Sequence, residues 1–95
     1  MGQESIVETH LRKQAKEHGY LCYKFTSPGN NGVPDRILIG HGEVLFIETK
    51  APKKVPRKLQ ERVHEKMRDH GANVLVIDTK EKVDDLFAKI LSKES

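Results

Sequence analysis

The sequence is poor in cysteine and in aromatic residues, with one cysteine, Cys22, no tryptophan, three phenylalanines and two tyrosines. A single cysteine excludes an intrachain disulfide and a zinc site made of cysteines. The five histidines show no His-x-x-x-His spacing, so they form no recognisable metal motif. No apolar run approaches the ~20 residues needed to cross a bilayer, and the N-terminus has no signal-peptide pattern. We therefore expect a cytoplasmic protein without a membrane partner.

Charge is abundant and unevenly placed. Hydrophobic residues make up 36% of the 95-residue chain and charged residues 33%, a globular composition with a highly charged surface. This length is enough for one compact core, so we expect a single domain over residues 1–95. The net charge is only +3, but five cations fall within nine residues that contain no acid, namely Lys50, Lys53, Lys54, Arg57 and Lys58. Such a run is either a solvated surface or a contact for a phosphate backbone. Because it begins at Lys50, beside the carboxylates discussed below, contact with a phosphate backbone is favoured.

The pattern of apolar residues predicts an α/β fold, a small mixed β-sheet flanked by helices in the order α-β-β-β-α-β-α. The predicted helices cover residues 4–18, 56–70 and the segment after residue 78. The predicted strands cover residues 20–25, 37–39, 44–47 and 73–77.

The helix ends carry recognisable signals. Gly19 and Gly71 are expected to end the first two helices. Asp78 and Glu81 form a capping-box-like pair at the start of the third helix. The stripe of the second helix expected to face the core is formed by Leu59, Val63 and Met67.

The segments 37–39 and 44–47 are separated by Gly40-His41-Gly42-Glu43, which is typical of a β-hairpin. With His41 and Gly42 in the loop, the cross-strand pairs are Gly40 with Glu43, Ile39 with Val44, Ile37 with Phe46 and Asp35 with Glu48. Asp35 and Glu48 would then face each other about 5 Å apart, with Lys50 on the same face. Both faces of the hairpin are apolar, so we expect helices on both sides of it.

Two facing carboxylates repel each other and need compensation, which a retained proton or a cation can supply. Lys50 offsets one negative charge but not two. A hard divalent ion, which prefers oxygen ligands, would offset the remainder. The alternative is structural: Asp35 caps the turn after Pro34, and Glu48 forms an ordinary ion pair with Lys50.

The motif Gly32-x-Pro34-Asp35, followed by Glu48-x-Lys50, resembles the PD-(D/E)xK nuclease superfamily and, more narrowly, its VRR-NUC (virus-type replication-repair nuclease) family. The resemblance covers residues 4–87. Its supporting features are Tyr23-Lys24-Phe25 before Ser27-Pro28-Gly29, Lys50-Ala51-Pro52 after the acidic pair, and Gln60 in the next helix. Val55 departs from the serine common at that place in the family, which bears on where the helix starts.

This resemblance implies a restriction-endonuclease-like core and a metal-dependent DNA endonuclease that hydrolyses phosphodiester bonds. Stand-alone members of the family resemble Holliday-junction resolvases. The resemblance therefore also implies a homodimer that selects branched DNA during replication, repair or recombination. The source would be bacterial, or a phage in a bacterial host.

It also implies roles for individual residues. The catalytic residues would be Asp35, Glu48, Lys50 and Gln60. The ligands of one or two Mg²⁺ or Mn²⁺ ions would be Asp35, Glu48, the backbone carbonyl of Thr49, and Glu8. The DNA contacts would be Lys24, Ser27, Lys53, Lys54, Arg57 and Lys58.

Several of these residues have structural interpretations that remain open. Glu8 has the spacing to pair with Arg12 along a helix, Lys24 could extend to solvent at a sheet edge, and Gln60 could be an exposed helical residue. At the level of function, the alternatives are a non-catalytic nucleic-acid-binding module and a flap or nicking nuclease. A sequence-specific restriction enzyme is disfavoured, because no target-recognition region is evident.

Overall fold

The structure, a computed structural model, describes residues 3–50 and 57–94. Its elements are α1 (Gln3–Glu17), β1 (Leu21–Lys24), β2 (Arg36–Gly40), β3 (Glu43–Thr49), α2 (Lys58–Asp69), β4 (Asn73–Ile77) and α3 (Lys80–Glu94). The predicted order α-β-β-β-α-β-α and the fold class are therefore confirmed. No helix in the described ranges is long and apolar enough to cross a bilayer.

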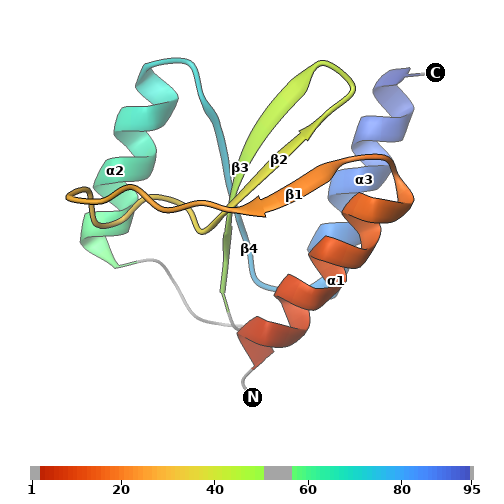
Figure 1. Cartoon of the computed structure of the whole chain (residues 1–95), viewed down its shortest axis with the longest axis horizontal. Coiled ribbons are helices and arrows are strands. Elements are labelled where there is room, and N and C mark those ends of the chain that lie inside the picture. The colour runs from red at the N-terminus through yellow and green to blue at the C-terminus, as the bar shows by residue number, and fades with distance from the viewer. Residues whose placement is uncertain (1–2, 51–56, 95) are drawn as a thin grey trace.

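The four strands lie in the order β1-β2-β3-β4, which is also their order along the chain (Figure 1). β1, β2 and β3 are antiparallel neighbours, whereas β4 runs parallel to β3 after the crossover through α2. The hairpin register is as predicted, with Ile39 opposite Val44 and Ile37 opposite Phe46. Its loop residues His41 and Gly42 have φ values of 51° and 77°, as a two-residue type I′ turn requires.

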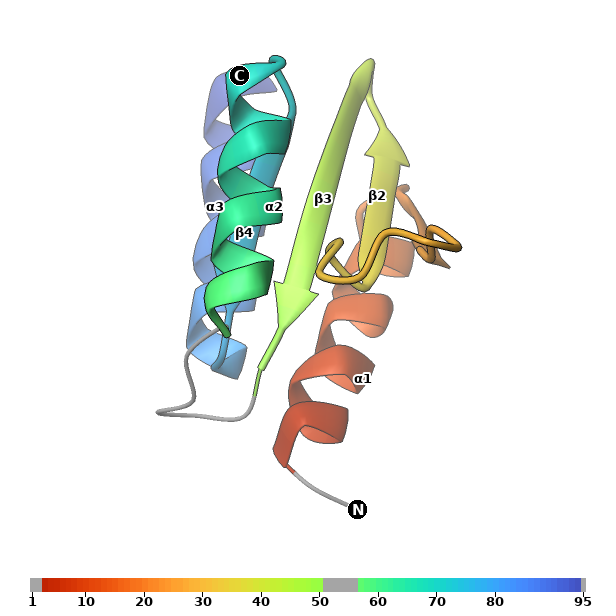
Figure 2. The ribbon, with the colours of Figure 1, turned by 90° about the vertical axis from the view of Figure 1, so that its left-hand side faces the viewer.

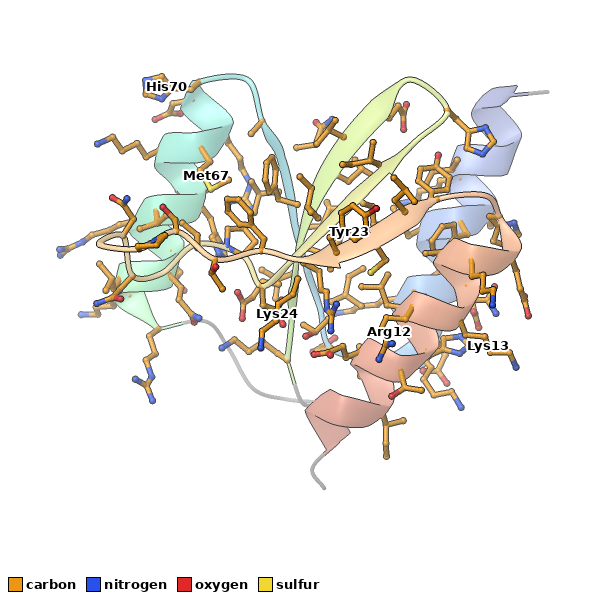
Figure 3. The ribbon with its side chains drawn as sticks, in the orientation of Figure 1. Arg12, Lys13, Tyr23, Lys24, Met67 and His70 are labelled. Atoms are coloured by element: carbon orange, nitrogen blue, oxygen red, sulfur yellow. The ribbon has the colours of Figure 1, made fainter. Side chains whose placement is uncertain are left out.

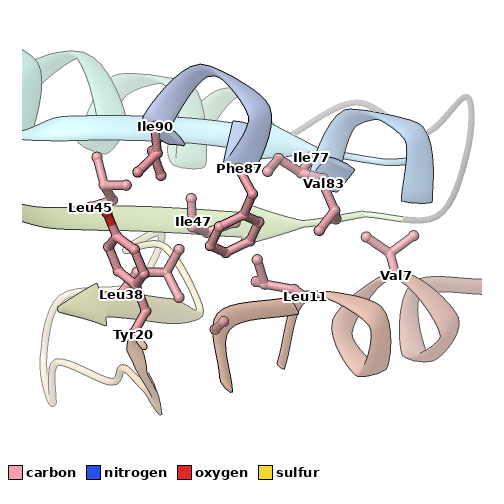
Figure 4. Packing of buried hydrophobic residues seen from close by; sticks show 11 residues of the cluster. Val7, Leu11, Tyr20, Leu38, Leu45, Ile47, Ile77, Val83, Phe87 and Ile90 are labelled. Carbon is pink, nitrogen blue, oxygen red and sulfur yellow. The ribbon is translucent and has the colours of Figure 1, made fainter. Parts of the chain in front are cut away.

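The hydrophobic core lies between the sheet and the helices α1 and α3 (Figure 4). Leu38 and Ile47 point from neighbouring strands into this layer, where both are fully buried. Leu11 of α1 and Phe87 of α3 meet them from the helical side. Because side chains alternate along a strand, the residues next to Leu38 on β2 and next to Ile47 on β3 face the opposite, outer side of the sheet.

The outer face is only partly covered, which corrects the expectation of helices over both sides of the hairpin. Viewed from the α2 side, Figure 2 shows α2 in front of β4, while β2 and β3 extend beyond it. Leu21, Tyr23 and Val44 are 50%, 55% and 46% exposed on this face. A single helix of 12 residues is too narrow to cover four strands.

Two helix starts differ from the predictions. Thr79 caps α3, since its Oγ1 accepts the Lys82 backbone N–H at 3.1 Å, so the predicted cap at Asp78 is wrong by one residue. Asp78 instead pairs with the Lys82 side chain at 2.8 Å. α2 begins at Lys58, because its N-cap Arg57 is extended with φ −68° and ψ 158°, so the predicted start at residue 56 is wrong.

Candidate active site

Asp35 lies just before β2, at the end of the loop formed by residues 26–34. Its Oδ1 accepts the backbone N–H of Thr49 at 2.9 Å, and its Oδ2 accepts the Thr49 hydroxyl at 2.7 Å. The carboxylate therefore ties the start of β2 to the end of β3 and does not cap its own turn. The β2–β3 ladder ends at the pair Arg36–Ile47, so Asp35 and Glu48 do not form the ladder pair that the sequence suggested.

Glu48, the next-to-last residue of β3, is only 4% exposed. Its Oε2 lies 3.4 Å from Lys50 Nζ and accepts a hydrogen bond from Gln60 Nε2 at 3.4 Å. Its Oε1 lies 4.0 Å from His64 Nε2. A buried carboxylate is costly unless charged or polar groups surround it, and β3 and α2 together supply them.

Gln60 is held in one orientation by two hydrogen bonds. Its Oε1 accepts the backbone N–H of Arg57 at 3.0 Å, and its Nε2 donates to Glu48. An amide can satisfy both bonds only with this assignment of oxygen and nitrogen. Gln60 thus contacts the acidic site and is not an ordinary exposed helical residue.

His64 is the site residue that the sequence did not reveal. It is 1% exposed and lies one helical turn beyond Gln60. Burial lowers the pKa of His64, and the nearby charges of Arg68 and Lys50 lower it further. Both effects favour the neutral form of the imidazole. The only sequence signal was its spacing of four from Gln60.

The stripe expected to face the core from α2 faces elsewhere. Leu59 is 50% exposed. Together with Val63 and Met67 it lines a groove of about 610 Å³ between α2 and the loop formed by residues 26–34. Figure 3 shows Met67 on α2. Gln60 and His64, and not the apolar stripe, therefore form the face of α2 that meets Glu48.

Glu8 lies on α1, which packs on the opposite side of the sheet from Glu48. Its Oε1 accepts a hydrogen bond from the guanidinium of Arg36, so it does not form the anticipated pair with Arg12. Arg36 is paired with Ile47 across the sheet and hence points away from the Glu48 face. Lys24 is exposed and lies opposite Arg36 in the β1–β2 ladder, on the other side of β1 from Tyr23 (Figure 3).

The predicted DNA contacts are only partly described. Arg57 and Lys58 are exposed at the start of α2. Ser27 lies in the groove beside α2, where its Oγ accepts a hydrogen bond from the Asn30 side chain at 3.0 Å. Lys53 and Lys54 lie outside the described residues.

The oxygen atoms at this site suit a hard divalent cation. Among the side chains that the structure describes, no three from aspartate, glutamate, histidine and cysteine form a metal-ligating group. Mg²⁺, however, needs only one or two carboxylates and retains several waters. The N–H and C=O of a strand residue point to the same side, so the Thr49 carbonyl is on the Asp35 side of β3. Asp35, Glu48 and this carbonyl therefore fit Mg²⁺ or Mn²⁺.

Comparison with known proteins identifies the family of the chain. The chain is 38% identical over 80 residues to a protein named "Putative nuclease p44" from Acyrthosiphon pisum secondary endosymbiont phage 1, and the match covers 83% of this chain and 86% of that protein. A solved structure described as a VRR_NUC domain superposes with a TM-score of 0.85 at 30% identity, covering 93% of this chain and 97% of that one. No family model matches the chain. On its relatives and its fold, the chain belongs to the VRR-NUC family of nucleases.

Proposed function

We propose that this chain is an endonuclease that hydrolyses DNA phosphodiester bonds with the help of Mg²⁺ or Mn²⁺. One observation carries the proposal: Glu48 is buried beside Lys50, and Asp35 is bound to Thr49, the residue between them. A module that only binds DNA gains nothing from burying a carboxylate next to a polyanion.

Asp35, Glu48 and the Thr49 carbonyl would hold the ion. When bound, such an ion polarises a phosphoryl oxygen and lowers the pKa of a coordinated water. Each Asp35 oxygen accepts one hydrogen bond from Thr49 and keeps a free lone pair for this purpose. Glu8 would contribute through water, because its Oε1 already binds Arg36.

Lys50 and Gln60 have separate tasks at Glu48. The Lys50 ammonium, 3.4 Å from Oε2, would stabilise negative charge that gathers on the phosphate in the transition state. Gln60 orients the Glu48 carboxylate through its Nε2–H and links it to the start of α2 through Arg57.

The DNA contacts would be to the sugar-phosphate backbone. Lys24 at the end of β1 and Arg57 and Lys58 at the start of α2 are exposed cations. Lys53 and Lys54 add charge close to Arg57 in the sequence. The Ser27 hydroxyl can donate to a phosphate oxygen while it accepts from Asn30. Contacts of this kind position a duplex without reading its bases, which favours selection by DNA shape.

Selection by shape suits branched DNA such as a four-way junction, and a two-fold junction suits a two-fold dimer. The half-exposed Leu21, Tyr23 and Val44 on the outer sheet face provide apolar area that a second copy could bury. Analytical ultracentrifugation on a junction should detect a dimer, and a monomer at every concentration would contradict this part of the proposal.

The direct test is cleavage of labelled four-way junction, flap, single-stranded and linear duplex DNA in Mg²⁺, in Mn²⁺ and in EDTA. Asp35→Ala and Glu48→Ala should each lower the rate at least ~100-fold, as expected for loss of a major electrostatic catalyst. Glu17→Ala, an exposed acid at the end of α1, should cleave like the unmodified protein.

Each result has a distinct meaning. Cleavage that needs metal and Glu48 supports the nuclease, and symmetric nicks confined to the junction support the proposed substrate. Metal-dependent cleavage of flaps or nicks alone would overturn only the substrate. Near-normal cleavage by Asp35→Ala would overturn the assignment of the site, and binding without cleavage of any substrate would favour a non-catalytic module.

A further inference from the structure

His64 is a buried polar side chain that the proposed reaction does not use. It is 1% exposed, and its Nε2 makes no hydrogen bond within the described part of the chain. Glu48 Oε1 lies 4.0 Å from this nitrogen. A buried ring nitrogen without a hydrogen bond reduces stability relative to an apolar group in the same place. Packing alone therefore gives no reason for a histidine at this position.

The geometry around Glu48 suggests what the histidine does. Gln60 and His64 are four residues apart on α2, so their side chains project from the same face of the helix. Gln60 donates to Oε2, and His64 faces Oε1. One turn of α2 therefore presents a nitrogen to each oxygen of the same carboxylate.

We propose that His64 is a positioning residue that fixes the orientation of the Glu48 carboxylate for metal binding. This inference rests on the proposed function, since it assumes that Glu48 holds the ion. The imidazole is buried, so it is not placed to contact substrate. It restrains Oε1 while Gln60 restrains Oε2, which prevents the carboxylate from rotating about its last bond.

Partners of metal ligands commonly change metal affinity about 10–100-fold when they are mutated. His64→Leu removes both ring nitrogens but keeps a side chain of similar volume. The affinity of the DNA-free protein for Mn²⁺, measured by isothermal titration calorimetry, should fall about 10-fold or more. His64→Gln, which retains an N–H donor of comparable reach, should restore most of the lost affinity.

His70→Leu is the matched control. His70 is on the same helix, but it is exposed at the end of α2 and its Nδ1 contacts the Lys66 carbonyl of that helix (Figure 3). Its replacement should leave Mn²⁺ affinity unchanged. Urea unfolding of each metal-free variant establishes that it is folded, and His64→Met replaces His64→Leu if the latter does not fold.

Two results would overturn the inference: unchanged Mn²⁺ affinity in the folded apolar variant, or a His64→Gln affinity as low as that of the apolar variant. The second result would assign His64 a purely structural role. Glu48→Ala, titrated in parallel, separates this failure from failure of the proposed function. If Glu48→Ala binds Mn²⁺ normally, the proposed metal site is itself wrong.

Discussion

Thr49 is the residue on which the geometry of the site depends most directly. It is fully buried, and both its backbone N–H and its hydroxyl bind the Asp35 carboxylate. Its two neighbours in sequence are Glu48 and Lys50. A residue with no charge of its own thereby brings together three groups of the Asp…Glu-x-Lys motif.

Thr49→Val keeps the shape of the side chain and removes one of the two hydrogen bonds to Asp35. The free energy of unfolding, measured by urea denaturation, should fall by about 1–2 kcal/mol, since the lost bond has a charged acceptor that water partly reaches. The DNA cleavage rate should fall about 10-fold or more, because Asp35 is no longer held in place.

Thr79→Val is the control for Thr49→Val. It removes the cap of α3, Thr79 Oγ1 to the Lys82 N–H, at a cost of about 1 kcal/mol. It should leave the cleavage rate unchanged, because Thr79 does not contact the acidic residues. Equal rates for the two valine variants would show that the Asp35–Thr49 contact has no catalytic importance.

Cys22 offers a prediction about pH. Cys22 packs against the core. Burial has the largest influence on the pKa of its thiol and raises that pKa above 9.0. The unfolded chain loses this proton at lower pH than the folded chain, so the contribution of Cys22 to stability is present below pH 9.0 and is lost as pH rises above it.

Urea denaturation at pH 8 and pH 10 should therefore show a smaller loss of stability in Cys22→Ala than in the unmodified protein. Alkylation by iodoacetamide should also be slow at pH 8, where the thiolate is scarce. Modification at the rate of a free thiol would contradict the burial of Cys22.

The residues that sequence motifs specify were easier to predict than those that packing specifies. The hairpin register and the closeness of Glu48 and Lys50 could be predicted because strand alternation follows from local sequence, whereas the predicted pairing of Asp35 with Glu48 was wrong. The contacts of Arg36 with Glu8 and of His64 with Glu48 could not be predicted, because the partners are distant in sequence. The role of each site residue in the reaction stays a prediction until the variants are measured.

Among the elements, the loop formed by residues 26–34 and helix α2 are packed closely at one point. Gly32 has a φ of 97°, a conformation that favours glycine. A Cβ added there would lie 3.0 Å from Val63 Cγ2 and 3.1 Å from the Leu59 carbonyl oxygen. Gly32 therefore sets how closely the loop, and Asp35 after it, approaches α2.

Gly32→Ala should lower the free energy of unfolding by about 1–3 kcal/mol, because it combines an unfavourable φ with this steric contact. Gly29→Ala is the matched control, with a φ of 82° but no atom within 4 Å of the added Cβ. In urea denaturation Gly29→Ala should lose less stability than Gly32→Ala. The reverse order would mean that the loop does not pack on α2 as described.

The strands were predicted more closely than the helix faces and helix ends. The pair His41-Gly42 fixes the hairpin register, because few residue pairs adopt the turn it requires. The face of α2 was predicted wrongly, because an apolar stripe can pack against a loop as well as against a sheet. The cap of α3 was misplaced because Asp78 and Thr79 are adjacent and both are good capping residues.

At the scale of the whole molecule, a net charge of +3 matters less than its distribution. Arg57 and Lys58 are exposed near the site, whereas Lys89 is exposed on α3, on the other side of the sheet (Figure 1). DNA binding should depend on the first two residues and not on Lys89.

For the Glu48→Ala protein and junction DNA, the logarithm of the binding constant should fall linearly with the logarithm of salt concentration. Arg57→Gln and Lys58→Gln, each added singly to that protein, should reduce the magnitude of the slope by about 1, the value for one lost phosphate contact. Adding Lys89→Gln should leave the slope unchanged. Equal effects of all three substitutions would indicate a diffuse electrostatic attraction and no defined DNA-binding surface.

The position of α2 in the chain also has a consequence for synthesis. The β2–β3 hairpin can pair before residues 58–69 have been made, because it involves only neighbouring segments. Gln60 and His64 reach Glu48 only after α2 has been made, and the β3–β4 pairing that holds the crossover needs residues 73–77 as well. We therefore expect a nascent or truncated chain to be harmless to DNA. DNA cleavage would begin only when enough of the chain has left the ribosome for β4 to pair with β3.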